Sequence, residues 1–211
     1  MSASPQIIES PKSIVNSPKS ICKLDIGCGS NKAKDHIGMD AIAFEGVDVV
    51  HDLRETPWPF EDNSVEAANC SHVLEHLTNF NGKWERVRFW NELWRVMVPV
   101  EYNSAGAPVK GVARVVIPHW ASNRYYGDPT HCEPMSEFAI CYLDPEWRKN
   151  NAPHTDIKHN PNGYNCHWAV SYDYTLHQDL AGKNEAYLRW ALTFSKEAAQ
   201  DLLLTCACIK K

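Results

Sequence analysis

The feature that most constrains the fold of this chain is a glycine-rich turn that follows a short apolar segment. Residues 21–26 (ICKLDI) read as a buried strand, and Gly27-Cys28-Gly29-Ser30-Asn31 come directly after them. Glycine tolerates positive φ and lets the backbone approach a ligand closely. In an open α/β sheet, ligands bind beside the carboxyl ends of the strands. We therefore predict a ligand-binding turn at the end of the first strand of such a sheet.

Strand and helix patterns alternate after this turn and indicate a doubly wound, mostly parallel α/β sheet. Helical spacing of apolar residues predicts helices over residues 81–98 and 185–200, and a helix over 135–150 that is interrupted near Pro145. Near-continuous apolar runs are typical of the strands of such sheets. Further strands are expected at residues 36–40, 47–52, 65–70, 112–117, 167–176 and 202–209.

The predicted helix over residues 81–98 carries both tryptophans and basic residues. Trp90 and Trp94 recur at helical spacing, which predicts a face that packs on the sheet. The basic residues are interpreted as a solvated helix face. They are Lys83, Arg86, Arg88 and Arg95.

The length and composition of the chain indicate how its domains are organised and in which compartment it is expected. Residues 21–211 suit a single domain, with residues 120–170 expected to form a substrate-side insertion. Residues 1–20 contain the unit SPKSI twice and are expected to be a flexible leader. No signal peptide precedes the eight cysteines and no apolar run approaches membrane-spanning length, so we expect a reduced, cytoplasmic protein.

Two aspartates end the next two predicted strands and point to an adenosyl ligand. Asp40 is placed to accept both hydroxyls of a ribose, and Asp52 to bind an adenine amino group while Leu53 packs on the ring. A dinucleotide site would need a third glycine where this chain has Lys32. The few residues before His36 also leave little room for a helix that could bind a pyrophosphate. The pattern therefore favours an adenosyl group with an amino-acid tail over a nicotinamide dinucleotide.

The segment KLDIGCGSN resembles the first motif of class I S-adenosylmethionine (SAM) dependent methyltransferases. The segments VDVVHDL and PWPFEDNSVEAANCSHVLEHL resemble the type 11 methyltransferase domain, and the resemblance covers about residues 22–120. It implies a Rossmann-like sheet of seven strands in the order 3-2-1-4-5-7-6, the last strand antiparallel. Two features depart from that family: the helix after the glycine turn is truncated, and residues after 120 match no substrate-binding region.

The resemblance also implies roles for individual residues. Asp25 and the turn residues Gly27, Cys28, Gly29 and Asn31 would hold the methionine part of SAM. Asp40 would bind the ribose, and Asp52 with Leu53 the adenine. Ser71 and His72 would line the pocket beside the sulfonium.

Methyl transfer to an oxygen or nitrogen also needs a proton acceptor, and histidine can serve as one near neutral pH. The candidates are His119 after the fifth main strand, with Asp128 and His131 in the next loop; His72 and His76 come second. Other histidines and cysteines have zinc-ligand chemistry but irregular spacing, so we predict no metal site. They are His131-Cys132, His154, His159 and Cys166-His167.

The acceptor is expected to be a small molecule. Motifs of the form [DN]PP[YFW], typical of base-amine methyltransferases, and the Pro-Cys motif of cytosine-carbon methylation are both absent from the sequence. A net charge of −5 argues against broad nucleic-acid binding, which depends on a basic surface. Three alternatives stay open: a SAM-binding module without catalysis, a methyltransferase of nucleic acid or protein that uses the basic helix residues, and a nicotinamide-dependent oxidoreductase. The oligomeric state is left open.

Overall fold

The computed structural model describes residues 21–210, so the predicted leader over residues 1–20 lies outside the described residues. Seven strands form the main sheet in the order β3-β2-β1-β4-β7-β9-β8. Counted along the chain this order is 3-2-1-4-5-7-6, and β9 is antiparallel to both of its neighbours, as the resemblance implies. The strands are β1 (Cys22–Ile26), β2 (Ile37–Asp40), β3 (Val49–Val50), β4 (Val65–Ser71), β7 (Val112–Pro118), β8 (Trp168–Leu176) and β9 (Ala199–Cys208).

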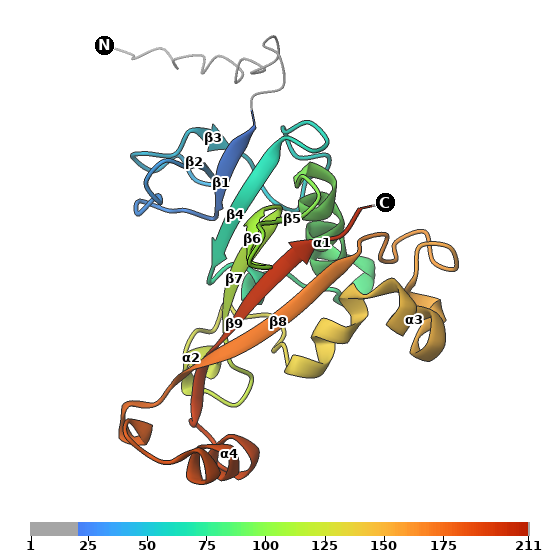
Figure 1. Cartoon of the computed structure of the whole chain (residues 1–211). Coiled ribbons are helices and arrows are strands. Elements are labelled where there is room, and N and C mark those ends of the chain that lie inside the picture. The colour runs from blue at the N-terminus through green and yellow to red at the C-terminus, as the bar shows by residue number, and fades with distance from the viewer. Residues whose placement is uncertain (1–20, 211) are drawn as a thin grey trace.

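The helices and a small hairpin lie in the connections after β4. Figure 1 shows α1 and α3 beside the sheet, with α4 at the lower end of the molecule beyond the ends of β8 and β9. The hairpin β5 (Glu101–Tyr102) and β6 (Pro108–Lys110) was not predicted from the sequence. The helices are α1 (Glu85–Val96), α2 (Asn123–Tyr126), α3 (Pro145–Asn151) and α4 (Glu185–Phe194). Five 3₁₀ segments accompany them: η1 (Leu74–His76), η2 (Phe80–Gly82), η3 (Glu137–Leu143), η4 (Pro153–Thr155) and η5 (Gln178–Leu180).

Several predicted boundaries were wrong, and local backbone geometry explains them. The helix expected from residue 81 begins at Glu85, because Trp84 adopts a left-handed conformation with φ of 52°. The helix expected over residues 185–200 ends at Phe194, and residues 199–200 already belong to β9. The predicted interruption near Pro145 is confirmed: η3 ends at Leu143, and the Asp144 side chain caps the amino end of α3.

The apolar face of α1 lies in the hydrophobic core, as its tryptophan spacing predicted. Trp90 is 2% exposed, and its ring centroid lies 6.1 Å from that of Trp168 on β8. Phe89 is fully buried and makes an edge contact with Trp58, at 5.4 Å between ring centroids. These contacts pack α1 against β8 and against the loop that contains Trp58.

The first four strands are joined without helices. Within residues 21–210, the connections 27–36, 41–48 and 51–64 contain turns and bends alone. A row of exposed side chains also crosses the middle of the sheet, where Arg114 pairs in register with Thr205 and Thr205 with Ser171. Successive side chains of a strand point to opposite faces of the sheet, and buried neighbours such as Leu204 point to the other face. The row of exposed side chains therefore lies on a face of the sheet that is open to solvent. The predicted sheet is thus confirmed, with helical cover that is concentrated on one side.

All eight cysteines lie within the described residues and are free thiols. Among residues 21–210, no helix has both the length and the apolar character needed to cross a membrane.

Candidate functional site

The glycine turn is joined directly to the carboxyl end of β2. Gly27 has φ of +64° and donates its N–H to the Met39 carbonyl at 2.7 Å. Gly29 has φ of +52° and donates its N–H to Asp40 Oδ2 at 2.9 Å. A Cβ added at Gly29 would meet no atom within 4 Å, so this side of the turn is open. The turn and the Asp40 carboxylate therefore form one surface with room for a ligand.

The segment after the turn has no helix, and contacts of two of its residues, Ala33 and Lys32, hold it in place. Asp25, 9% exposed, accepts a hydrogen bond from the backbone N–H of Ala33 through Oδ2 at 2.7 Å. Lys32 forms an ion pair with Asp48 at 2.7 Å, and Asp48 also accepts from the N–H of Gly38 at 2.8 Å. The ammonium of Lys32 holds the pKa of Asp48 below its ordinary value. Lys32, which replaces the third glycine of a dinucleotide motif, thus anchors the loop to the chain just before β3.

The remaining predicted cofactor residues lie at the ends of β3 and β4. Asp52 is half-buried and accepts from the backbone N–H of Arg54 at 2.9 Å, while Leu53 is 8% exposed. Ser71 and His72 are exposed, and Ser71 Oγ lies 3.0 Å from His72 Nδ1. These side chains follow strands that are parallel to β1, so they gather at the same edge of the sheet as the glycine turn. Of the rest of the turn, Cys28 is buried and Asn31 is exposed.

His119 lies inside the protein with both ring nitrogens hydrogen bonded. Its side chain is 5% exposed, and Nδ1 accepts from the backbone N–H of Ala121 at 3.2 Å. Nε2 therefore carries the proton and donates to Glu137 Oε1 at 2.9 Å. The hydroxyl of Tyr174 donates to the same oxygen at 2.8 Å. This geometry favours a role for His119 in tying the end of β7 to η3 and β8.

The Glu137 carboxylate should make folding stability depend on pH in the acid range. Its hydrogen bond from His119 lowers the pKa of Glu137 to about 2. A depressed carboxyl pKa stabilises the fold above the unfolded value of about 4.3 and ceases to do so as pH falls toward the folded value. We expect E137Q to lower the melting temperature by a few degrees at pH 7 and by progressively less below about pH 4.

The measurement is thermal unfolding of wild type and E137Q between pH 3 and 7. The exposed residue Glu146 provides the control, because E146Q removes a surface ion pair with Lys149 and should change stability little at any pH. A gap between wild type and E137Q that stays constant across this range would contradict the expected role of the Glu137 charge.

His76 and His131 lie side by side although they are far apart in the sequence. Their ring centroids are 4.8 Å apart, with His76 at the end of η1 and His131 in the loop after α2. His131 Nδ1 lies 2.6 Å from the Tyr125 carbonyl, and Nε2 lies 3.8 Å from Asp128 Oδ2. Burial and the neighbouring His131 lower the pKa of His76, so its imidazole is neutral at pH 7. The structure therefore brings together two of the first-choice catalytic candidates, Asp128 and His131, and one of the second-choice candidates, His76.

Glu75 is a further candidate that the sequence reasoning missed. It is 2% exposed, and neither carboxylate oxygen has a hydrogen-bond partner. Burial raises the pKa of Glu75 to about 7. Its position within the SHVLEHL segment gave no signal of burial, because glutamate is seldom fully buried without a partner.

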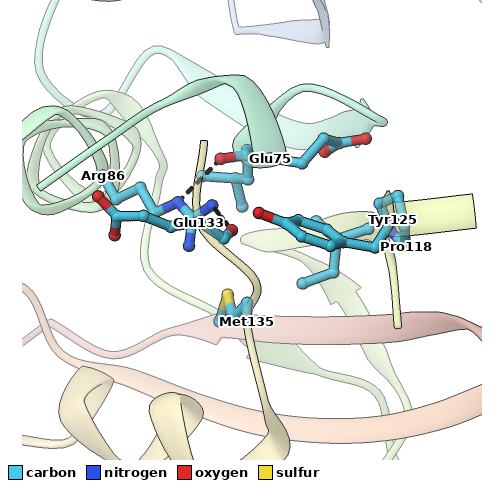
Figure 2. Close-up of a pocket in the computed structure, with 8 residues that line it drawn as sticks. Glu75, Arg86, Pro118, Tyr125, Glu133 and Met135 are labelled. Carbon is cyan, nitrogen blue, oxygen red and sulfur yellow. Dashed lines mark hydrogen bonds between the residues drawn. The ribbon is translucent and has the colours of Figure 1, made fainter. Parts of the chain in front are cut away.

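A small pocket is lined in part by Glu75 (Figure 2). Arg86 extends from α1 and donates to the Leu74 carbonyl at 2.9 Å and to the Glu133 carbonyl. Figure 2 shows the Glu75 carboxylate directed away from Arg86, toward the side of Pro118 and Tyr125. Arg86 thus joins η1 to the loop that carries His131. The pocket is lined by Leu74, Glu75, Arg86, Ile117, Pro118, Tyr125, Glu133 and Met135.

The interpretation of the basic helix residues as a solvated face was wrong. Arg86 is 6% exposed and hydrogen bonded inside the protein. Arg95 is half-buried and pairs with Glu92 and Asp62, both at 2.8 Å. Only Lys83 of the four is largely exposed. These side chains do not form a continuous basic surface.

Among known proteins, this chain matches solved structures but no family model and no curated sequence. A SAM-dependent methyltransferase from Archaeoglobus fulgidus is similar with a TM-score of 0.57 and 15% identity, covering 89% of this chain and 86% of that one. A SAM-dependent methyltransferase from Methanosarcina mazei gives a TM-score of 0.49 at 12% identity, covering 92% and 95% of the two chains.

The fold is assigned from the similarity to the Archaeoglobus structure. The observed strand order is a second observation that supports the same fold. At 15% identity the likeness extends to the fold and no further. Residues 21–210 of this chain have the class I SAM-dependent methyltransferase fold, with helix-free connections among its first four strands.

Proposed function

We propose that this chain binds SAM at the carboxyl ends of β1–β4 and transfers its methyl group to an oxygen or nitrogen of a small-molecule acceptor. The observation that carries the proposal is the hydrogen bond from Gly29 to Asp40, which unites an open glycine turn with a strand-end carboxylate. Such a pair can contact an amino-acid tail and a ribose at once.

The polar groups at this edge match the parts of SAM. Each Asp40 oxygen accepts one backbone N–H, from Gly29 or Ile42, and keeps a lone pair for a ribose hydroxyl. Asp52 and the buried Leu53 suit the amino group and the ring of adenine. Asp25, Gly27, Cys28 and Asn31 would form the side that receives the methionine part. A helix amino terminus after the turn would serve to bind a phosphate. SAM has no phosphate, so a turn without a following helix is compatible with SAM binding.

The chain's own residues would then orient the acceptor and take its proton. SAM supplies a methyl carbon that is already activated by its sulfonium, so alignment provides much of the catalysis. Ser71 and His72, exposed at the end of β4, would line the space beside that carbon. Asp128 and His131 are the proton acceptors we favour, because the ring nitrogens of His119 are both engaged.

The small-molecule acceptor and the cytoplasmic location are parts of the same proposal. Internal pairing of Arg86 and Arg95 leaves the net charge of −5 without a compensating basic surface on α1, which disfavours a nucleic-acid acceptor. Exposed aromatic side chains in residues 120–170 support the assignment of this segment to the acceptor side. These are Trp120, Tyr126 and Phe138. The eight free thiols support a reducing compartment.

Isothermal titration of the protein with SAM, S-adenosylhomocysteine and NAD tests the cofactor. We expect micromolar affinity for both adenosyl ligands and no heat with NAD. A screen of hydroxyl and amine acceptors with methyl-labelled SAM then tests transfer. Binding of NAD in preference to SAM would overturn the cofactor assignment, and tight SAM binding without transfer to any acceptor would favour a non-catalytic module.

A further inference from the structure

We propose that Glu75, His76 and His131 bind a divalent transition-metal cation. One potential ligand atom from each residue lies within 4.8 Å of the other two. Glu75 and His76 come from η1 after β4, and His131 comes from the loop after α2. The proposal is separate from SAM binding, because the cluster uses none of the residues assigned to the cofactor.

The first support is the buried Glu75 carboxylate. Burying a carboxylate without a hydrogen bond is costly, and buried polar groups in folded proteins nearly always have partners. Glu75 is only 2% exposed, yet neither of its carboxylate oxygens has a hydrogen-bond partner. Arg86 does not fill this role, because its guanidinium donates to carbonyl oxygens and Glu75 is directed away from it (Figure 2). A cation between Glu75 and the two histidines would supply the missing partner.

The second support is the tautomer of His131. Its Nδ1 lies 2.6 Å from the Tyr125 carbonyl oxygen, which can only accept, so Nδ1 carries the proton. In the neutral form of the ring, the lone pair is then on Nε2. Metal-binding histidines commonly donate their other N–H to a backbone carbonyl or a carboxylate, which fixes the ring for coordination.

His76 is held in the same tautomer by a chain of two hydrogen bonds. Thr130 Oγ1 donates its proton to Asp128 Oδ1 at 2.6 Å. The hydroxyl must therefore accept at its other contact, from His76 Nδ1 at 3.1 Å. His76 Nε2 is left with a free lone pair, as in His131. Both imidazoles are thus prepared to act as ligands by residues of the 128–131 loop and by Tyr125.

The donor set indicates the kind of cation. Two imidazoles with one carboxylate suit borderline ions such as Zn²⁺ or Co²⁺, and three protein ligands leave a position open for another group. Ligand atoms bonded at about 2.1 Å lie no more than roughly 4.2 Å apart, so the cluster would close by about half an ångström. The open position would suit an acceptor oxygen. With the cation bound, His131 would be a ligand, and of the two favoured proton acceptors only Asp128, which is outside the ligand set, would keep that role.

Titration of chelator-treated protein with Co²⁺, followed by visible absorption, tests the site without SAM or acceptor. We expect one Co²⁺ per chain with a visible ligand-field band, displaced by Zn²⁺. Removing a ligand in E75Q, H76Q or H131Q should weaken Co²⁺ binding by more than about 100-fold. The T130V variant, which loses the partner of His76, should weaken it by about 10-fold.

His159 provides the matched control, because it is an exposed histidine outside the cluster. The H159Q variant should bind Co²⁺ as wild type does. Circular dichroism checks the fold of each variant, and if H131Q does not fold, E75Q and T130V decide the question. Absence of saturable Co²⁺ and Zn²⁺ binding to wild type, or undiminished binding to folded E75Q and H76Q, would overturn the proposal. SAM binding is measured separately, so either result leaves the cofactor assignment to its own test.

Discussion

Replacing Asp40 with alanine is expected to weaken SAM binding by at least about 100-fold. In the proposed complex, the two oxygens of Asp40 accept hydrogen bonds from both ribose hydroxyls. Hydrogen bonds to a charged group contribute about 1.5–3 kcal/mol each, so two of them amount to about 3–6 kcal/mol. That range corresponds to roughly 10² to 10⁴ in the dissociation constant. Titration with S-adenosylhomocysteine measures this loss without turnover, and D40N, which keeps one carbonyl acceptor, should give an intermediate affinity.

Asp48 provides the control for the structural part of this effect. Like Asp40, it accepts a backbone N–H in this region, from Gly38 at 2.8 Å, but it precedes β3 and lies outside the proposed ribose position. D48A should lower thermal stability and keep the affinity for S-adenosylhomocysteine within a few-fold of wild type. Equal affinity losses in D40A and D48A would mean that Asp40 acts through the conformation of the loop. Unchanged affinity in D40A would overturn the placement of the ribose.

The cofactor edge could be predicted from the sequence because its determinants are local. A strand, a glycine turn and an aspartate at the end of the next strand are each visible within a few residues. The parallel arrangement then brings the ends together, as the contact between Gly29 and Asp40 shows. Local reasoning also found the truncated helix after the turn, because Gly29 and His36 are too close in sequence for one.

The cluster around Glu75 could not be predicted, because it depends on tertiary contacts. His76 and His131 are 55 positions apart and belong to no paired ligand motif. The irregular spacing of the histidines predicts no metal site, whereas the proposed site at Glu75, His76 and His131 is formed by residues that only the fold brings together. The burial of Arg86 has the same cause: helical periodicity places it on α1, but its partners at Leu74 and Glu133 lie in other segments.

Element boundaries failed where the backbone changes direction for tertiary reasons. Apolar spacing continues through Trp84, yet that residue is left-handed and stops the helix from extending toward residue 81. Residues 199–200 fit a helical pattern but belong to β9, where Ala199 pairs with Leu176 of β8 and the Gln200 carbonyl accepts a hydrogen bond from the His119 N–H. Sheet pairing here outweighs the intrinsic preference of the sequence.

Replacing Arg86 with methionine is expected to destabilise the protein by about 3 kcal/mol or more and to disturb the cluster at Glu75. Arg86 is 6% exposed, and its guanidinium joins the Leu74 carbonyl to the Glu133 carbonyl. Methionine fills similar space but leaves both carbonyl oxygens without this partner, at about 1.5–3 kcal/mol for each charged hydrogen bond. A loss of that size should lower the melting temperature by about 6–12 °C for a chain of this length.

Arg88 on the same helix gives a matched comparison, because its Nε is buried and has no hydrogen-bond partner. Removing an unpaired buried donor is nearly neutral or stabilising, so R88M should leave the melting temperature close to that of wild type. R86M should also weaken Co²⁺ binding, since Arg86 holds the loop of His131 against η1, whereas R88M should not. Equal destabilisation in the two variants would show that apolar packing of the arginine side chains, and not the bridge between two loop carbonyls, is what α1 contributes here. A stable R86M with normal Co²⁺ binding would mean that the loop keeps its position without the bridge.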